Sequence, residues 1–222
     1  MGLVVDPSNS FVYVSDRHSI ARINSFDVNG NTNGGTAHTE FYTVTKLTGT
    51  TTTGNVDGDS STARFNEPRF VTIDSAGTFL YVSDVLNYGI RRINLKDSLY
   101  PTVTYASFGT NKETNGIALN AAGTILYAVA TSLNKIWAIP ILSGGAYPSY
   151  SSSWMAIGTG TAGQLVDGSL DTAQFNLPSS LTIDDQDNLY VVDNYEKTVA
   201  VYKGPTYKYY NNAIRRIDTK NS

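Results

Sequence analysis

Short apolar runs alternate with clusters of turn-forming residues along nearly the whole chain. Runs such as Phe-Val-Thr-Ile at 70–73 and Leu-Tyr-Val-Ser at 80–83 are rich in the β-branched and aromatic residues that favour strands. Between such runs stand Gly, Asn and Asp, as at 74–77 and 184–188, which favour tight hairpin turns. The pattern therefore predicts an all-β protein made of many short strands joined by hairpins.

A block of sequence occurs twice, and its second copy lies 110 residues after the first, as from Val56 to Val166. Each copy begins with Val-Asp-Gly and continues with Thr-Ala, a Phe, an Asn and a Pro. A strand ending in Ile-Asp follows, then a second strand that ends in Asp84 or Asp193, and then Ile-Arg-Arg-Ile. Repetition at a fixed offset indicates an array of similar structural units.

Two weaker copies fill the rest of the chain and keep an Ile-x-x-Ile strand, at 20–23 and 136–139. The equivalent tyrosines of the four copies are Tyr13, Tyr81, Tyr127 and Tyr190. The chain is therefore expected to form one domain of four units, at about residues 1–48, 49–108, 109–157 and 158–222.

This repeat resembles that of the NHL family, in which a Gly-rich segment, Asp-Gly, a Phe and a Pro precede the Leu-Tyr-Val strand and Ile-Arg. Two copies match closely and two loosely. The resemblance implies a β-propeller, here with four recognisable NHL-like blades. We expect Phe65 and Phe175 to fill the space between blades, and outer strands near residues 41–47, 103–108 and 154–157.

The fourth blade is expected to lack its outer strand, because its third strand lies at 214–217, close to the last residue of the sequence. An unpaired sheet edge is a template for another strand. Three interpretations stay open: a fragment of a larger propeller, an assembly in which another chain supplies the strand, and a compact four-bladed ring.

Composition and charge exclude several classes of function. The 222-residue chain has 16 basic and 19 acidic side chains and a net charge of −3, which argues against nucleic-acid binding. No apolar run approaches the ~20 residues of a membrane span, and the first residues do not form a signal peptide. Because cysteine is absent, disulfides, thiolate metal sites and thiol nucleophiles are excluded.

Candidate catalytic and metal-binding residues are few and scattered. His18 and His38 cannot reproduce the multi-histidine metal site of the lyases that resemble this fold. The segments 55–59 and 27–31 have the alternating Asn and Asp residues with which a calcium-binding loop begins. Neither segment is followed by the Gly and the Glu that such a loop has at its sixth and twelfth positions. We therefore predict no enzymatic activity, no cofactor and no metal. The alternative is a lactonase- or esterase-like hydrolase with an axial divalent cation. The glutamates of this chain, which such a cation site would need, all fall in loops or insertions: Glu40, Glu67, Glu113 and Glu196.

The arginine pairs at 91–92 and 215–216 suggest a second alternative, an RNA-binding NHL propeller. Neighbouring residues of a strand point to opposite faces, so neither pair forms one patch. We instead expect these arginines to pack their aliphatic stems and to cap a neighbouring turn. Acidic residues that close the second strands recur at equivalent places, which indicates turn capping rather than an active site: Asp16, Asp84 and Asp193.

Two insertions distinguish the copies from one another, at residues 24–43 and 195–211. The first is rich in Gly and Asn, and its strand-like segment 41–44 could pair with a neighbouring chain. The second has two β-rich runs around Gly-Pro and predicts a hairpin that projects from the last blade. Tyrosine is favoured at protein interfaces, so the predicted partner-binding residues are the tyrosines of this hairpin: Tyr195, Tyr202, Tyr207, Tyr209 and Tyr210.

The leading prediction is a non-catalytic propeller scaffold that binds a protein partner or copies of itself through blade edges and this hairpin. Only 16% of the residues are charged, and Ser, Thr, Asn and Tyr are abundant. Such a composition favours an extracellular or cell-surface location, with a cytoplasmic one left open.

Overall fold

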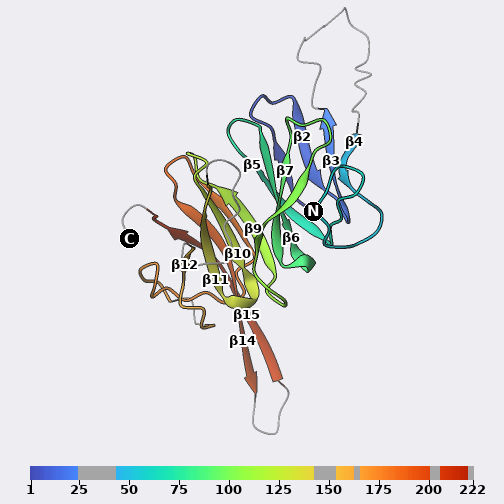
Figure 1. Ribbon diagram of the computed structural model, residues 1–222. Helices are drawn as coiled ribbons and strands as arrows, with labels where there is room; N and C mark the ends of the chain where they lie inside the picture. The colour runs from blue at the N-terminus through green and yellow to red at the C-terminus, as the bar shows by residue number, and fades with distance from the viewer. Residues whose placement is uncertain (25–43, 143–153, 163–165, 201–205, 220–222) are drawn as a thin grey trace, which may run out of the picture. The chain divides into compact units, whose positions relative to one another are not determined.

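The computed structural model describes residues 1–24, 44–142, 154–162, 166–200 and 206–219, with the backbone alone at 195–200 and 206–211 (Figure 1). In these residues fifteen strands form four antiparallel sheets, and the strands of each sheet follow one another in chain order. The all-β class and the propeller architecture predicted from the repeat are confirmed.

The first and second sheets have four strands each. The first contains β1 (Leu3–Val5), β2 (Phe11–Ser15), β3 (Ser19–Asn24) and β4 (Val44–Gly49). The second contains β5 (Pro68–Ile73), β6 (Phe79–Asp84), β7 (Gly89–Asn94) and β8 (Thr102–Ser107), with a 3-10 turn η1 (Val85–Asn87) after β6.

The third sheet has four strands and the fourth has three among the described residues. The third contains β9 (Thr114–Leu119), β10 (Ile125–Ala130), β11 (Lys135–Pro140) and β12 (Met155–Ile157), with a 3-10 turn η2 (Thr131–Leu133) after β10. The fourth contains β13 (Ser180–Ile183), β14 (Leu189–Ala200) and β15 (Thr206–Ile217).

The outer strands lie where the sequence predicts them, as β4, β8 and β12. No fourth strand pairs with β15 in the part of the chain that the structure describes, as predicted. Of the segment 41–44, only Val44 is described, and it pairs with Ile23 inside the first sheet. Residues 25–43 of the first insertion, with His38 and Glu40, lie outside the described residues.

One turn chemistry closes the hairpin between the first two strands of every sheet. An Asx oxygen at the end of the first strand accepts hydrogen bonds from two backbone N–H groups of the turn, at 2.6–3.0 Å. The hydrogen bond from the Asn188 side chain lowers the pKa of the last of these carboxyls, Asp184. The tight turns predicted at 74–77 and 184–188 are confirmed, and the four residues are Asp6, Asp74, Asn120 and Asp184.

The chain divides into two compact units, residues 1–87 with 91–104 and residues 88–90 with 105–222. In the first unit, Phe65 comes from the loop between β4 and β5 and is fully buried. It packs among side chains of both sheets of that unit, as predicted: Tyr13, Ile20 and Leu47 of the first sheet, and Val71, Leu80, Val82 and Ile93 of the second.

The second unit repeats this arrangement around Phe175, which is 1% exposed. Phe175 comes from the loop that precedes β13 and packs with side chains of the third and fourth sheets, again as predicted. The core includes Tyr127, Val129 and Ile136 of the third sheet, and Leu181, Leu189 and Val191 of the fourth. Among the described residues, no helix is long and apolar enough to cross a membrane.

Candidate interaction site

Arg91 in β7 ties the loop before the second sheet to that sheet. Its guanidinium donates to the carbonyl oxygens of Val56 and Arg64, each at 2.8 Å. It also forms ion pairs with Asp57 at 2.8 Å and with Asp84 at 3.1 Å. Because the Arg91 side chain is 1% exposed and Asp84 is fully buried, water does not screen the second pair. The loop is therefore fixed through one buried cation.

Arg215 in β15 makes the same contacts one repeat later. It donates to the carbonyl oxygens of Val166 at 2.9 Å and Gln174 at 2.8 Å. Its ion pairs are with Asp167 at 2.6 Å and with the buried Asp193 at 3.0 Å. The expectation that the first arginine of each pair caps a neighbouring loop is confirmed, and neither side chain is free to bind a phosphate.

The second arginine of each pair lies on the other side of its strand. Arg92 places its guanidinium 4.5 Å from the ring centroid of Phe79, and Arg22 stands in the same way over Phe11 at 4.5 Å. Arg216 donates to Asn188 Oδ1 at 3.0 Å. Such stacking and local hydrogen bonding match the expected structural role.

Asp84 and Asp193 also cap the loop backbone, as predicted. Asp84 accepts the N–H of Asn66 at 2.7 Å, and Asp193 accepts the N–H of Asn176 at 2.7 Å. Burial raises the pKa of Asp84, whereas this N–H, the Asn87 amide and Arg91 lower it. Asp16 is exposed, and for this residue the expectation stays a prediction. The arginine that such an acid would hold is replaced by Ala21 in the first sheet.

The remaining residues considered for chemistry are dispersed or structurally engaged. Asp59 accepts hydrogen bonds from Ser61 and Thr62, which lower its pKa to about 2. Within the 55–59 segment, Val56 bridges to Arg64 and Gly58 to Thr102. His18 lies in the β2–β3 turn. No group of three or more His, Asp or Glu side chains converges to hold a metal in the described residues.

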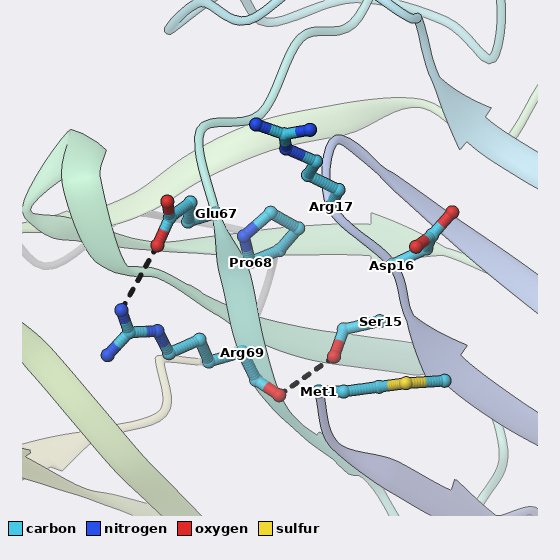
Figure 2. Close-up of a pocket in the computed structure, with 7 residues that line it drawn as sticks. All are labelled: Met1, Ser15, Asp16, Arg17, Glu67, Pro68 and Arg69. Carbon is cyan, nitrogen blue, oxygen red and sulfur yellow. Dashed lines mark hydrogen bonds and ion pairs between the residues drawn. The ribbon is translucent and has the colours of Figure 1, made fainter.

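A hollow of about 220 Å³ opens beside Pro68 at the start of β5 (Figure 2). Glu67 and Arg69 form an ion pair of 3.0 Å on one side, and both are over 40% exposed. The buried Ser15 hydroxyl faces the hollow but donates to the Arg69 carbonyl at 2.7 Å. Arg17 lies over Pro68 without a partner among the labelled residues (Figure 2). The described lining thus lacks the converging polar groups that mark a ligand pocket.

The predicted hairpin is present in the fourth sheet. β14 and β15 are twelve residues each and pair from Leu189↔Ile217 to Ala200↔Thr206, and Figure 1 shows their far end projecting beyond their sheet. Tyr195, Tyr207, Tyr209 and Tyr210 all belong to this ladder, whereas Tyr202 lies outside the described residues.

The register of the ladder separates these tyrosines into two sets. Tyr195 pairs with Asn211, Tyr207 with Val199 and Tyr209 with Lys197. Because successive residues of a strand alternate between faces, these three tyrosines take positions on one face. Tyr210, which pairs with Glu196, takes a position on the other.

A second candidate surface lies at the outer edge of β15, and the second sheet shows what such an edge can hold. There, Gly58 of the loop exchanges two backbone hydrogen bonds with Thr102 of β8, at 2.7 and 2.9 Å. Ser60 donates its N–H to the Leu99 carbonyl at 2.8 Å, and the Thr104 hydroxyl donates to Asp57 at 2.9 Å. The outer strand β8 is thus bound to the loop as well as to its sheet.

Among the residues that the structure describes, the equivalent groups of the fourth sheet have no strand beside them. Val166 still bridges to Gln174, as Val56 does to Arg64, but among the described residues no strand bridges to Gly168 as Thr102 bridges to Gly58. The side chain of Asp167 is 90% exposed, compared with 50% for Asp57. The loop and the edge of β15 therefore present hydrogen-bonding groups that face solvent.

A hollow of about 270 Å³ lies between this loop and β15. Its apolar lining includes Ile157, Leu170, Phe175 and Ile217, and Asp167 and Gly168 stand at its polar side. We call the space bounded by these six residues the strand groove. The sequence predicts the missing strand but not the loop side of the groove. The equivalence of Asp167 and Gly168 to Asp57 and Gly58 is the sequence feature that could have indicated this loop side of the groove.

No family model and no curated protein matches the chain. Similar solved structures include a putative 6-phosphogluconolactonase from Bacteroides uniformis, with a TM-score of 0.54 at 14% identity over 96% of this chain and 54% of that one. A catalytically inactive virginiamycin B lyase from Staphylococcus aureus, solved with quinupristin, gives a TM-score of 0.51 at 14% identity, over 94% and 54%. A nidogen/laminin complex gives 0.54 at 17% identity, over 88% and 59%.

These neighbours are propeller-like proteins, and the chain spans just over half of their length. At such low identities the likeness shows the fold alone. Because the neighbours differ widely in what they do, the shared fold assigns no function to this chain.

Proposed function

We propose that the chain is a non-catalytic NHL-type propeller module that binds proteins, including copies of itself, through the fourth sheet. The observation that carries the proposal is the edge of β15, which pairs with no further strand among the described residues and lies beside a loop whose counterpart in the second sheet is hydrogen-bonded to β8. An open strand edge pairs readily with another polypeptide because its N–H and C=O groups need partners.

The hairpin of β14 and β15 adds contact area to this edge. It carries the tyrosines predicted to bind partners, and three of them take positions on one face of the ladder. Tyrosine provides a large, amphipathic surface at a low cost in conformational entropy, which suits a protein interface.

Membership of the NHL family is supported by what the repeated residues do. The Asp of Val-Asp-Gly, the Asp that closes the second strand and the first Arg of Ile-Arg-Arg-Ile meet in one network, in both close copies of the repeat. The same commitment of arginines and aspartates to the blades supports a non-catalytic role over the hydrolase and RNA-binding alternatives. The sparse charge supports an extracellular or cell-surface location.

The proposal is tested by sedimentation equilibrium of the intact chain over a wide range of concentrations. We expect a mass above the 24.0 kDa of one chain that rises with concentration. Ile214 is 76% exposed on β15, so Ile214→Lys should reduce the association without unfolding the protein. Val44→Lys is the matched control, because Val44 is 65% exposed in the first sheet. A mass of one chain at every concentration would overturn the proposal.

A further inference from the structure

We propose that a pocket at the turn end of the first two sheets binds a small organic acid through its carboxylate group. The donors are the Arg22 guanidinium, the Lys96 ammonium and the Tyr13 hydroxyl. The lining residues belong to the first compact unit. The inference therefore goes beyond the protein-binding function proposed above and does not depend on the fourth sheet.

The pocket has a volume of about 390 Å³, which suits a small molecule. Its lining comes from the β1–β2 turn, the β5–β6 turn and the segment after β7. Strands β2 and β3 contribute the side chains of their facing positions at this end of the first sheet. We call the space bounded by six of the lining residues the turn pocket: Asp6, Phe11, Tyr13, Arg22, Gly77 and Lys96.

Arg22 brings to the turn pocket a positive charge that no acid offsets by an ion pair among the described residues. Its side chain has no hydrogen-bond acceptor in that part of the chain, and its Nε–H is buried. The guanidinium lies 4.5 Å from the centroid of the Phe11 ring, which holds it in place. Lys96 is exposed at the pocket and also lacks an ion pair within the described ranges. A negatively charged acceptor would complement both side chains.

The fourth sheet shows the same strand position when the chain itself supplies the acceptor. Arg216, the equivalent of Arg22, donates to Asn188 Oδ1 at 3.0 Å. Asn188 stands two residues before the tyrosine of its strand, and Phe11 stands at that place in the first sheet. Because a phenyl ring cannot accept in this way, the first sheet leaves its arginine available to a ligand.

The tyrosine of the first sheet differs from its equivalent in the same sense. The Tyr190 hydroxyl donates to Asp184 at 3.2 Å, whereas each oxygen of Asp6 already accepts two hydrogen bonds within its own turn. Burial raises the pKa of Tyr13, and the negative charge of Asp6 raises it further. The Tyr13 hydroxyl therefore keeps its proton and is a donor at neutral pH.

The charges of the turn pocket favour a monoanion. Burial acts to raise the pKa of Asp6, but the hydrogen bonds from Ser8 and the turn backbone lower it below its usual value, so this carboxyl is ionised. Arg22 and Lys96 thus exceed Asp6 by one positive charge. A carboxylate carries one negative charge and two oxygens that match the planar guanidinium. Sulfate carries a second charge, which Asp6 would repel.

Isothermal titration calorimetry of the intact chain with four probes tests the inference, in a buffer without carboxylate or phosphate. Benzoate and glucuronate are carboxylates with an aromatic and a sugar body, benzamide is the neutral counterpart of benzoate, and sulfate is a dianion. We expect at least one of the two acids to bind, sulfate to bind more weakly and benzamide to give no binding heat. The tighter acid identifies the body that the natural ligand carries.

Variants of the donors locate the binding at the turn pocket. Arg22→Met keeps an aliphatic stem over Phe11 and should weaken binding of the acid about tenfold or more. Tyr13→Phe should weaken it severalfold. Lys96→Gln changes an exposed side chain, so it should weaken binding and reduce its salt dependence without disturbing the core. Arg17→Met is the matched control, because Arg17 is an exposed arginine in the β2–β3 turn, at the other end of β2.

The inference is overturned if neither acid binds, if benzamide or sulfate binds as tightly as the acids, or if Lys96→Gln and Arg22→Met leave binding unchanged. It is also overturned if Arg17→Met weakens binding as much as Arg22→Met does. Sedimentation of the same samples separates the two proposals. Binding of an acid by a chain that stays a monomer would support the turn pocket and remove the proposed self-association.

Discussion

Replacing Arg91 by methionine tests whether one buried cation holds the loop to the second sheet. Methionine keeps much of the aliphatic packing over Phe65 but removes both ion pairs and the bonds to two carbonyl oxygens. Asp84, which is fully buried, is then left without its cation. Removing one partner of a buried ion pair costs about 3–5 kcal/mol, so we expect Arg91→Met to lower the free energy of unfolding by about that amount.

The same change one repeat later provides an internal comparison. Arg215→Met also leaves a buried acid, Asp193, without its cation. However, Asp167 is 90% exposed, and an exposed ion pair contributes only about 0–1 kcal/mol. We therefore expect Arg215→Met to cost about 1 kcal/mol less than Arg91→Met.

Urea unfolding followed by fluorescence measures both losses, with the two compact units monitored separately where their transitions differ. The pH dependence gives a second readout. Burial already raises the pKa of Asp84 in the folded protein, and loss of the Arg91 cation raises it further, so the Arg91→Met variant loses more stability than the unchanged protein as pH rises through that pKa. The difference from the unchanged protein should therefore shrink as pH falls.

Asp84→Asn is the control that identifies the buried charge as the cause. Combined with Arg91→Met, it keeps an acceptor for the Asn66 N–H while removing the unpaired carboxylate. The double variant should be more stable than Arg91→Met alone. A loss below about 1 kcal/mol for Arg91→Met, or a double variant that is no more stable, would refute the reasoning.

Three further predictions concern the loops and their phenylalanines. Phe65→Ala and Phe175→Ala should each cost about 3–5 kcal/mol in urea unfolding, because each ring is nearly fully buried between two sheets. Gly58→Ala should cost about 1–3 kcal/mol, since its Cβ would clash with Thr62 Oγ1, and adding Thr62→Ala should recover part of the loss. The Asp59 carboxyl has its pKa lowered to about 2, so its stabilisation of the loop should disappear as pH falls from about 4 to about 2. Amide exchange at Ser61 and Thr62 should show this loss, and Asp59→Asn should remove the pH dependence.

Strands and turns were predictable because their signals are local. The runs around Tyr81 and Tyr190 and the Asx turns at Asp74 and Asp184 each depend on a few adjacent residues. The burial of Phe65 was also predictable, because a large apolar residue preserved in the loop of both close copies has to pack against the sheets that the loop joins.

The arginine network was only partly predictable, because its members are far apart in the sequence. Arg91 contacts Asp57 and Asp84, and nothing in the local pattern of any of the three indicates the other two. A comparison among copies carries some signal. In the third sheet, Trp137 stands in the place of the arginine, because it pairs with Ala128 as Arg215 pairs with Val191. Ala130 stands in the place of Asp84. The arginine and the acid are thus lost together there.

Asp16 also depends on a partner that its own local sequence does not indicate. Asp16 repeats the position of Asp84 in the sequence, but the strand opposite carries Ala21 where the cation should be. An acid at this position is buried only when an arginine offsets the cost of removing it from water. Burial of the acid is therefore a property of the pair and not of the acid alone.

The loop network connects the stability of the blades to the proposed binding of a strand. Arg215 holds Asp167 and the carbonyl of Val166, and these residues flank the loop side of the strand groove. In the second sheet, Arg91 and the Thr104 hydroxyl share one oxygen of Asp57, so the outer strand contacts a carboxylate that the arginine has already placed. Arg215→Met should consequently weaken the self-association of the chain, even under conditions where the variant stays folded. In a chain with this network, the contact that joins loop to blade also prepares the site for the fourth strand.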